Sequence, residues 1–426
     1  MKFTLALSII CCACAALATT AGAIEIDVKK LGAKGDGKKD ESAIIQKALT
    51  MAGKQGGGTV FLPAGKYRLD HALIIPTGVT LTGSWKSPHH SQQTGGTILL
   101  AYAGKGKEDG PALIELLPSS AVRGMTIFYP EQKLPDPIPY PWTIQGSGMH
   151  PSAEDITLVN PYKGIDFGSK PNELHYARNV YGCPLKIGVY LDSCTDIGRV
   201  ENVHFNPHYW MRSDAKGLPG WNFLIDYLGK NLIAFDIGFS DWEMLVDTFS
   251  FGAKIGYRFR TGVNTPKGCN GSFVGIAADS ATRAIVVEDC RHYGLLISNG
   301  QFVGKDNETI MEVAATNTGI VQLTNCAFWG KCGKAVSVDG KGSVSLSQCN
   351  FQHWDYSEKG LPAVEALDGD LIVQACQFQI ARKQVFLGEN VKTAVIQGNR
   401  FMMSTQIENK SKGSVEIGLN VVRMEP

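Results

Sequence analysis

The chain has 426 residues, of which 44% are hydrophobic and 19% are charged, so it can bury a large core. Its 41 basic and 40 acidic side chains leave a formal net charge of +1. This balance excludes the strongly basic surface of a typical nucleic-acid-binding protein and the acidic tail of many interaction segments, and we expect no nucleic-acid partner.

Residues 1–23 have the pattern of a secretory signal peptide. Lys2 supplies a short basic start, residues 3–17 are apolar, and residues 21–23 (A-G-A) provide the small side chains of a cleavage site. A buried N-terminal helix is the alternative interpretation. No later stretch approaches the roughly 18 apolar residues that a membrane span needs. The sequence therefore predicts a secreted or periplasmic product that begins near Ala23 and has no membrane span.

Residues 31–83 combine one short amphipathic helix with strands that are separated by Gly and Pro turns. Asp40 and Ser42 are candidate N-caps for a helix near residues 40–53, because either side chain can accept a hydrogen bond from a first-turn amide. The Gly56-Gly57-Gly58 run ends this helix. Hydrophobic side chains then alternate over residues 60–81, as they do in half-buried strands.

The wording of this segment resembles a known family signature. It reads G-D-G-K-K-D at residues 35–40 and G-G-G-T-V-F-L-P-A-G-K-Y at residues 56–67. Both are similar to the N-terminal signature of the pectate lyase superfamily, which includes rhamnogalacturonase-like and epimerase-like proteins. The resemblance implies an all-β fold, a right-handed parallel β-helix (solenoid) with a short N-terminal capping helix. Because this superfamily spans several chemistries, the resemblance leaves the reaction open.

A repeat in the C-terminal third supports a solenoid independently of the resemblance. Phenylalanines recur every 23 to 29 residues, which is the length of one solenoid coil, at Phe273, Phe302, Phe328, Phe351, Phe378 and Phe401. Stacked coils predict an internal aromatic ladder. Cys326, Cys349 and Cys376 then form a column of small apolar side chains in preference to disulfides, because stacked parallel side chains seldom reach disulfide geometry. No cysteine pair has the spacing of a zinc site, and we expect no metal there.

A second repeat relates residues 188–195 to residues 275–282 with a constant offset of 87. It predicts that the two segments occupy equivalent places in different coils. Asp192 and Asp279 then have two alternative roles, as acids in a substrate groove or as turn residues. The Asp-Ser-x-Thr pattern favours the turn role, and we keep Asp192 as a reserve catalytic candidate.

Three segments interrupt the coils, at residues 86–97, 129–148 and 206–222. They are rich in Pro, Gly, His and aromatic residues, and we expect surface loops that carry binding residues. No linker or composition change marks a domain boundary after the signal peptide. The sequence therefore predicts a single β-helix domain over residues 24–426.

Asp241 and Glu243 are the leading catalytic candidates. They are two residues apart, so on a regular strand both carboxylates point to the same face, as the acid and the base or nucleophile of a glycosidase require. The alternative is a structural ion pair on that face, with Arg258 or Arg260 as the partner.

Four residues are candidates for substrate contacts, because aromatic faces stack on sugar rings and arginine pairs with carboxylates: Trp142, His208, Trp210 and Arg212. Asn206-Pro207-His208 comes close to the D-P-H motif of alginate epimerases, but Asn replaces the Asp, and we give the match no weight. The histidines can equally be structural loop residues, and Trp210 can be a core residue.

The N-T-D, G-D-D, G-H-G and R-I-K elements of polygalacturonases are absent from the sequence. No Asp/Glu cluster of the kind that binds calcium occurs along the chain. The sequence-based prediction is a secreted glycoside hydrolase without a cofactor, which acts on a polysaccharide or oligosaccharide as a monomer or homotrimer. Two alternatives stay open: a lyase or C5-epimerase on a uronic acid polymer, with Ca²⁺ if it is a lyase, and a non-catalytic glycan-binding or cell-surface β-helix.

Overall fold

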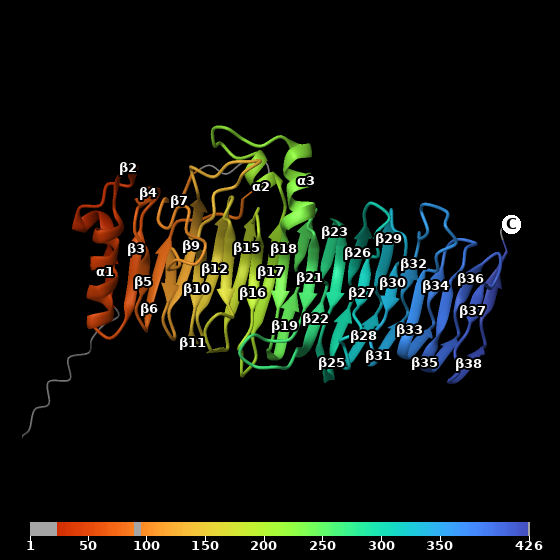
Figure 1. Cartoon of the computed structure of the whole chain (residues 1–426). Helices are drawn as coiled ribbons and strands as arrows, with labels where there is room; N and C mark the ends of the chain where they lie inside the picture. Colours follow the sequence, from red (N-terminus) through yellow and green to blue (C-terminus); the bar gives the residue numbers. More distant parts are fainter. Residues whose placement is uncertain (1–23, 89–94, 425–426) are drawn as a thin grey trace, which may run out of the picture.

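The computed structural model describes residues 24–88 and 95–424, and the predicted signal peptide lies outside the described residues. The strands stack into one elongated right-handed parallel β-helix (Figure 1). Each coil contributes a strand to three parallel sheets, here named A, B and C in chain order. The fold class predicted from the sequence is therefore confirmed.

Sheet A consists of β1 (Ile24–Asp27), β3 (Gly58–Leu62), β6 (Val79–Gly83), β9 (Ala121–Phe128), β12 (Ser152–Leu158), β15 (Tyr176–Gly182), β17 (Arg199–Phe205), β19 (Asp241–Val246), β22 (Cys269–Val274), β25 (Cys290–Ser298), β28 (Ile320–Thr324), β31 (Ser343–Ser347), the ends of β33 (Val364–Gln374) and β35 (Val385–Gln397), and β38 (Ser414–Gly418). Sheet B consists of β2 (Asp36–Asp40), β4 (Gly65–Leu69), β7 (Thr97–Ala101), the ends of β9, β12, β15 and β17, then β20 (Phe249–Phe251), β23 (Ala277–Ala281), β26 (Gln301–Gly304), β29 (Ala327–Gly330), β32 (Asn350–Phe351), β34 (Gln377–Phe378), β36 (Arg400–Met402) and β39 (Val421–Arg423).

Sheet C consists of β5 (Leu73–Ile75), β8 (Ile114–Leu116), β10 (Trp142–Gly146), β13 (Lys163–Phe167), β16 (Ile187–Leu191), β18 (Ile233–Ile237), β21 (Ile255–Phe259), β24 (Arg283–Val287), β27 (Met311–Val313), β30 (Val336–Val338), the starts of β33 and β35, and β37 (Ile407–Asn409). A separate short pair joins β11 (Gly148–Met149) to β14 (Asn172–Glu173). The helical elements are the 3₁₀ turn η1 (Val28–Leu31), α1 (Ser42–Lys54), α2 (His208–Met211) and α3 (Trp221–Asn231).

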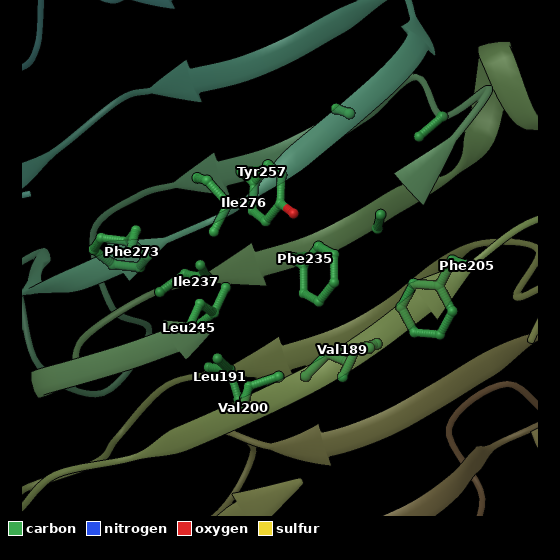
Figure 2. Close-up of a cluster of buried hydrophobic side chains, with 14 of the residues drawn as sticks. Val189, Leu191, Val200, Phe205, Phe235, Ile237, Leu245, Tyr257, Phe273 and Ile276 are labelled. Atoms are coloured by element: carbon green, nitrogen blue, oxygen red, sulfur yellow. The ribbon is translucent and has the colours of Figure 1, made fainter. Parts of the chain in front are cut away.

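The core lies between the inner faces of the three sheets. Inward side chains from successive coils stack on one another, as Val189, Phe235 and Tyr257 do in sheet C (Figure 2). The rings of Phe235 and Tyr257 are parallel, with centroids 4.8 Å apart. Because alternate residues of a strand point outward, this packing fixes which side chains of sheet C point away from the core.

Helix α1 covers the N-terminal end of the stack, as predicted (Figure 1). Its buried side chains, including Ile45, Leu49 and Ala52, lie over the first coil. Asp40 Oδ1 accepts a hydrogen bond from the Ser42 amide at 3.0 Å, so the predicted first-turn contact forms, although the N-cap position itself falls on Glu41. No helix within the described residues is long and apolar enough to cross a membrane.

The predicted phenylalanine ladder is present from Phe302 onward, in sheet B. Neighbouring rings lie 4.7 to 5.5 Å apart along the ladder from Phe302 to Phe401. Phe273 is an exception, because it lies on β22 in sheet A and its ring packs edge-on against Phe259. The eight cysteines of the described residues are free and buried, as the packing interpretation predicted.

The repeat with an offset of 87 does not relate equivalent places, so that prediction was wrong. Residues 188–191 lie on β16 in sheet C, whereas residues 277–281 form β23 in sheet B. The two aspartates differ accordingly. Asp192 is fully buried, while Asp279 is half-buried and accepts a hydrogen bond from the neighbouring Ser280 hydroxyl.

The three insertions interrupt the coils, but the second is shorter than predicted, because residues 142–146 form β10 of sheet C. Residues 89–94 of the first insertion lie outside the described residues. Residues 129–141 form an extended loop without helix or strand. The third insertion contains α2 and leads into α3, and both helices rise from the middle of the stack in Figure 1.

A candidate active site on sheet C

The outward face of sheet C carries polar side chains on six successive coils. We name these residues the polar row: Glu115, Gln145, Asp166, Tyr190, Asp236 and Arg258. Their register places each directly beside the next, about 4.8 Å apart. The residue before each member points inward and is apolar, so the alternation of the strands turns the polar row away from the core. Neighbouring side chains and turns cover the middle of the row, where Asp166, Tyr190 and Asp236 are 0, 8 and 5% exposed.

Tyr190 stands at the centre of the row and joins it to two residues of the adjoining turns. Its hydroxyl donates a hydrogen bond to Asp192 Oδ2 at 3.0 Å, and the Arg260 guanidinium carbon lies 5.2 Å from its ring centroid. On its other side the Trp142 ring stacks nearly parallel, with centroids 5.8 Å apart. Burial raises the pKa of Tyr190 and Asp192 adds to the rise, whereas Arg260 opposes it. The phenol therefore stays protonated at neutral pH, between an anion and a cation.

Asp192 is held by a dense set of donors. Backbone amides of Ser193, Phe239 and Val263 donate to its carboxylate at 2.6, 3.1 and 3.0 Å. Arg260 Nη1 adds a contact at 3.5 Å. Asp192 is fully buried. Together with the Tyr190 hydroxyl, these donors replace the water that the carboxylate lacks and fix it in one orientation.

Glycines make room for this carboxylate. A Cβ atom on Gly238 would lie 2.3 Å from Asp192 Oδ2, and one on Gly262 would lie 2.8 Å from Asp192 Oδ1. Both distances are below van der Waals contact, so a larger residue at either position would have to displace the carboxylate. The neighbouring coils are thus shaped around Asp192.

Arginines supply positive charge beside Tyr190. Arg260 Nε donates to Asp236 Oδ1 at 3.0 Å, and Arg258 forms a two-pronged pair with Glu288 at 2.8 and 3.0 Å. Burial disfavours the charged guanidinium of Arg260, but Asp236 outweighs it and holds the pKa of Arg260 above its ordinary value. Burial raises the pKa of Asp236, against the attraction of both arginines. Arg258 is half-exposed, so this positive charge reaches the surface.

Lys163 and Trp142 form the other flank of the site. The ammonium nitrogen of Lys163 lies 5.1 Å from the Trp142 ring centroid and donates to the Glu108 carbonyl at 2.9 Å. Burial lowers the pKa of Lys163. Trp142 is half-exposed, which leaves part of the indole open to a ligand.

Two of the residues predicted from the sequence meet here. Asp192 and Trp142 contact the same tyrosine from different coils, although the sequence argument had not connected them.

Asp241 and Glu243 are not paired on one outward face, and that prediction was wrong. Trp242 has a φ of 71°, and the register of β19 shifts between the two acids, so the strand alternation breaks there. Glu243 is fully buried, whereas the Asp241 side chain is 49% exposed and pairs with Arg291 at 3.0 Å. For Asp241 the alternative of a structural ion pair agrees better with the structure. Its partner is Arg291, and not Arg258 or Arg260 as considered from the sequence.

His208, Trp210 and Arg212 lie in and beside α2, away from sheet C. The Trp210 side chain is 2% exposed and packs in the core, which leaves little of it for a sugar. The His208 ring stacks on Trp221 of α3, with centroids 5.0 Å apart, and Arg212 is exposed. The structure therefore does not bring these three residues together with Trp142. The Asn206-Pro207-His208 turn is closed by the Asn206 side chain, which accepts from the His208 amide at 2.9 Å.

The corner between sheets C and A contains a buried cluster of His175, Cys194 and Glu243. Within the described residues this is the one group of three or more side chains that could hold a metal ion, with its ligand atoms within 4.8 Å of one another. Its nitrogen and sulfur atoms do not suit calcium, which takes roughly six to eight oxygen ligands. The His175 nitrogens also contact Asn172 Oδ1 at 2.8 Å and Glu243 Oε1 at 3.1 Å. These residues therefore do not fit the calcium ion considered for a lyase.

Tyr190, Asp236, Arg258 and Arg260 are the site residues that sequence reasoning missed. A signal was present, because a four-residue pattern recurs with a polar side chain at its third position. It reads G-I-D-F at residues 164–167, G-V-Y-L at 188–191, A-F-D-I at 234–237 and G-Y-R-F at 256–259. Aligning these segments would have found the polar row.

Comparisons with known proteins agree with this fold. Residues 25–112 match the family described as "Rhamnogalacturonase A/epimerase, pectate lyase-like". The bacteriophage phi29 gene product 12 in its pre-mature form has the same architecture, with a TM-score of 0.58 and 15% identity over 93% of this chain and 56% of that chain. The resemblance to the pectate lyase superfamily is therefore confirmed for the fold and the first coils.

Curated relatives match only a short segment. Alginate lyase 7 of Azotobacter vinelandii is 48% identical over 68 residues, which is 14% of this chain and 8% of that protein. Mannuronan C5-epimerase AlgE4 of the same organism is 44% identical over 68 residues, or 14% of this chain and 12% of that protein. The chain thus spans about a tenth of the length of these relatives. Neither name is that of a glycoside hydrolase, so the leading prediction from the sequence is not supported, and the lyase or epimerase alternative is favoured.

Proposed function

We propose that this protein is a polysaccharide lyase that cleaves a uronic acid polymer by β-elimination on sheet C. The observation that carries the proposal is the Tyr190 phenol, held between the Asp192 carboxylate and the Arg260 guanidinium on the outward face of the β-helix. The similarity to an alginate lyase and to mannuronan C5-epimerases supports the choice of a uronic acid polymer.

β-Elimination needs three things from a site. The proton at C5 must be removed, the charge that develops on the adjoining carboxylate must be stabilised, and the oxygen at C4 must leave with a proton. Arginines suit the second task because a guanidinium binds a carboxylate through two parallel hydrogen bonds. Arg260 and the half-exposed Arg258 lie on the coils after Tyr190, and we assign the substrate carboxylate to them.

We assign the proton transfers to Tyr190, with Asp192 as its relay. The phenol oxygen takes the C5 proton while its own proton moves to Asp192, 3.0 Å away. The phenol then gives a proton to the C4 oxygen as the C4–O4 bond breaks and the C4–C5 double bond forms, and Asp192 returns its proton to Tyr190. Every proton is accounted for, and the products are a new reducing end and an unsaturated sugar. No step requires a metal ion.

Trp142 has the position of a sugar platform. Its half-exposed ring lies parallel to Tyr190, so a pyranose that stacks on the indole face has its edge near the phenol. Lys163 is buried beside the indole, with its ammonium bonded to the Glu108 carbonyl, so we assign it to positioning Trp142.

A C5-epimerase is the second candidate, and the names of the relatives favour it. Its first step is the same removal of the C5 proton, but a proton then returns to the opposite face of the ring and the chain stays intact. Location outside the cytoplasm, predicted from residues 1–23, and the prediction of a monomer or homotrimer stay part of the proposal.

The test is incubation of the purified chain with polymannuronate, with three products measured in parallel. Ultraviolet absorbance reports the unsaturated sugar, a reducing-end assay reports chain cleavage, and deuterium uptake at C5 in heavy water reports reversible proton transfer. Tyr190→Phe should lower the rate by ~10²- to 10⁴-fold, the usual contribution of a general acid or base. Tyr356→Phe is the matched control, because this exposed tyrosine lies far along the stack from the polar row.

Each outcome separates the candidates. Absorbance with new reducing ends supports the lyase, and deuterium uptake without cleavage supports the epimerase. New reducing ends without absorbance would restore the glycosidase. Full activity in a correctly folded Tyr190→Phe variant would remove Tyr190 from the mechanism.

A further inference from the structure

An exposed aromatic cluster lies around the corner from the polar row, on the outward face of sheet A. Tyr293 is 71% exposed and Trp242 is 53% exposed, and Arg291 lies on β25, the same strand as Tyr293, two coils after Trp242. The guanidinium of Arg291 lies 4.7 Å from the Tyr293 ring centroid and pairs with Asp241 at 3.0 Å. We name Trp242, Arg291 and Tyr293 the corner platform.

Irregular backbone builds the platform at both ends. Trp242 has a φ of 71°, which is unfavourable for a bulky side chain. Burial of the indole does not offset this strain, because the residue is 53% exposed. Residues 291–294 form a bulge, because Cys290 pairs with Cys269 while Leu295 already pairs with Gly271. Bulges re-aim side chains and are frequent next to active sites. Two independent distortions thus present aromatic side chains to solvent.

The platform is continuous with the candidate active site. The Phe239 amide donates to Asp192, and the Arg291 guanidinium lies 5.9 Å from the Phe239 ring centroid. The loop of residues 261–268 provides a second connection, because Val263 donates to Asp192 while residues 266–268 face the bulge. Between this loop and residues 289–293 lies an open depression of about 370 Å³.

The chemistry of the platform suits a carbohydrate chain. Exposed aromatic rings stack on the apolar faces of pyranoses, and the two rings are two coils apart, about 10 Å at one strand spacing per coil. Lys267 and His292 line the same depression and are exposed, and Asp241 is paired with Arg291. The lining thus offers donors to sugar hydroxyls and carboxylates beside the exposed rings, with Lys267 as a cation and Asp289 as an anion that accepts from the Thr261 hydroxyl at 3.1 Å.

We propose that the corner platform is a second binding site for the polymer, which holds an anionic polysaccharide chain after it leaves the polar row. The proposal rests on the proposed function for the identity of the chain, a uronic acid polymer. It assigns no chemical step to the platform. Its consequence is a preference for long chains, since a short oligosaccharide that fills the polar row cannot reach both places.

Affinity electrophoresis in polymannuronate tests binding without any need for catalysis. Tyr293→Ala and Trp242→Gly should each weaken binding of the polymer by roughly tenfold, the scale of one lost aromatic contact. Both variants should raise KM for the polymer and leave kcat and the KM for a tetrasaccharide unchanged. Tyr356→Ala is the matched control, because Tyr356 is also exposed and also carries a cation, Lys331, over its ring at 5.2 Å.

Trp242→Gly also separates binding from packing. Glycine adopts a positive φ without strain, so this variant should keep or raise the melting temperature. A fall of several degrees would assign Trp242 to packing and remove it from the platform.

The outcomes distinguish this proposal from the proposed function. If the wild type cleaves the polymer and both variants bind it as the wild type does, the platform is overturned and the lyase stands. If the variants lose binding while the wild type forms no product, the lyase fails and the platform stands. A wild type that does not bind polymannuronate overturns the platform as a site for a uronic acid polymer.

Discussion

Asp192 is the most constrained polar residue of the candidate site. Its carboxylate is fully buried, and its donors come from three separate segments of the chain. If a buried carboxylate loses such donors, the free energy of unfolding falls. The surrounding glycines therefore matter as well, because they leave the space in which the carboxylate keeps its hydrogen bonds. The sequence showed Asp192 only as a turn residue or a groove acid, because its partners Phe239 and Val263 lie 47 and 71 residues further along the chain.

Gly238→Ala tests this constraint without replacing any charged residue. The added Cβ would lie 2.3 Å from Asp192 Oδ2, so the carboxylate must move and its hydrogen bonds to Tyr190 and Val263 must weaken. We expect a loss of ~1–3 kcal/mol in unfolding free energy, measured by denaturant titration, and at least a tenfold loss of activity.

Gly418→Ala is the matched control for that variant. A Cβ at Gly418 meets nothing within 4 Å, and this exposed residue at the end of β38 does not have a positive φ. It should leave stability and activity at wild-type values. If Gly238→Ala behaved like this control, Asp192 would not be held as tightly as its contacts indicate.

At the scale of strands, regular repeats were predictable and interruptions were not. The ladder from Phe302 onward follows from periodicity alone, because the coils of that region have similar lengths, whereas the capping role of α1 came from the family resemblance. The polar row was not predicted because Tyr190 and Asp236 are neighbours in space but 46 residues apart, with α2 and α3 between them. Phe273 was misplaced for the same reason, since spacing alone cannot distinguish sheet A from sheet B.

Strand alternation failed as a guide at β19. The prediction placed Asp241 and Glu243 on one face, which holds only for a regular strand. The positive φ of Trp242 turns the chain, so Glu243 enters the core beside His175 while Asp241 stays outside. No feature of the sequence marks this turn, because tryptophan is among the residues least expected at a positive φ.

The corner between sheets C and A predicts a pH dependence of stability. His175 is fully buried, and both of its ring nitrogens face oxygen acceptors, Asn172 Oδ1 and Glu243 Oε1. The Asn172 amide nitrogen donates to backbone carbonyls, so its oxygen is the atom that faces the ring. Burial disfavours the imidazolium, but Glu243 and the neighbouring Cys194 together outweigh it and raise the pKa of His175 to about 10.

A pKa raised in the folded state stabilises the protein below the unfolded value and loses this effect as the pH rises. The contribution of His175 is thus fully present below about pH 6.5, the ordinary histidine value, and declines through about pH 10. We expect the unfolding free energy of the wild type to fall between pH 7 and pH 10 more steeply than that of the double variant His175→Gln/Glu243→Gln.

Denaturant titrations at pH 6, 8 and 10 measure that difference. His71→Gln is the control, because the side chain of His71 is 78% exposed and should contribute almost nothing to the slope. Equal slopes in the wild type and the double variant would show that the corner pair is not charged in the folded protein.

At the scale of the molecule, the β-helix separates scaffold from function. The inner faces of the three sheets form one continuous core, while the polar row and the corner platform use outward positions on neighbouring coils. A solenoid allows this because the inward side chains of each coil pack against those of its neighbours, so the outward positions do not have to be apolar. The fold could be predicted from the chain in outline, whereas the site depends on which coils lie side by side.

The same architecture makes helix α1 essential for closing the N-terminal end of the β-helix. A single charged residue on the buried face of α1 should open this end. Leu49 is fully buried between α1 and the first coil, so Leu49→Asp places an unpaired carboxylate in the core and should release the helix. The free edges of β1, β2 and β5, the first strands of the three sheets, can then pair with another chain. We expect species heavier than the wild type in size-exclusion chromatography with light scattering. Thr50→Asp places the same charge on the exposed face of α1 and should elute as the wild type does. An unchanged mass for Leu49→Asp, with its helix content intact, would mean that α1 is not needed to close this end of the β-helix.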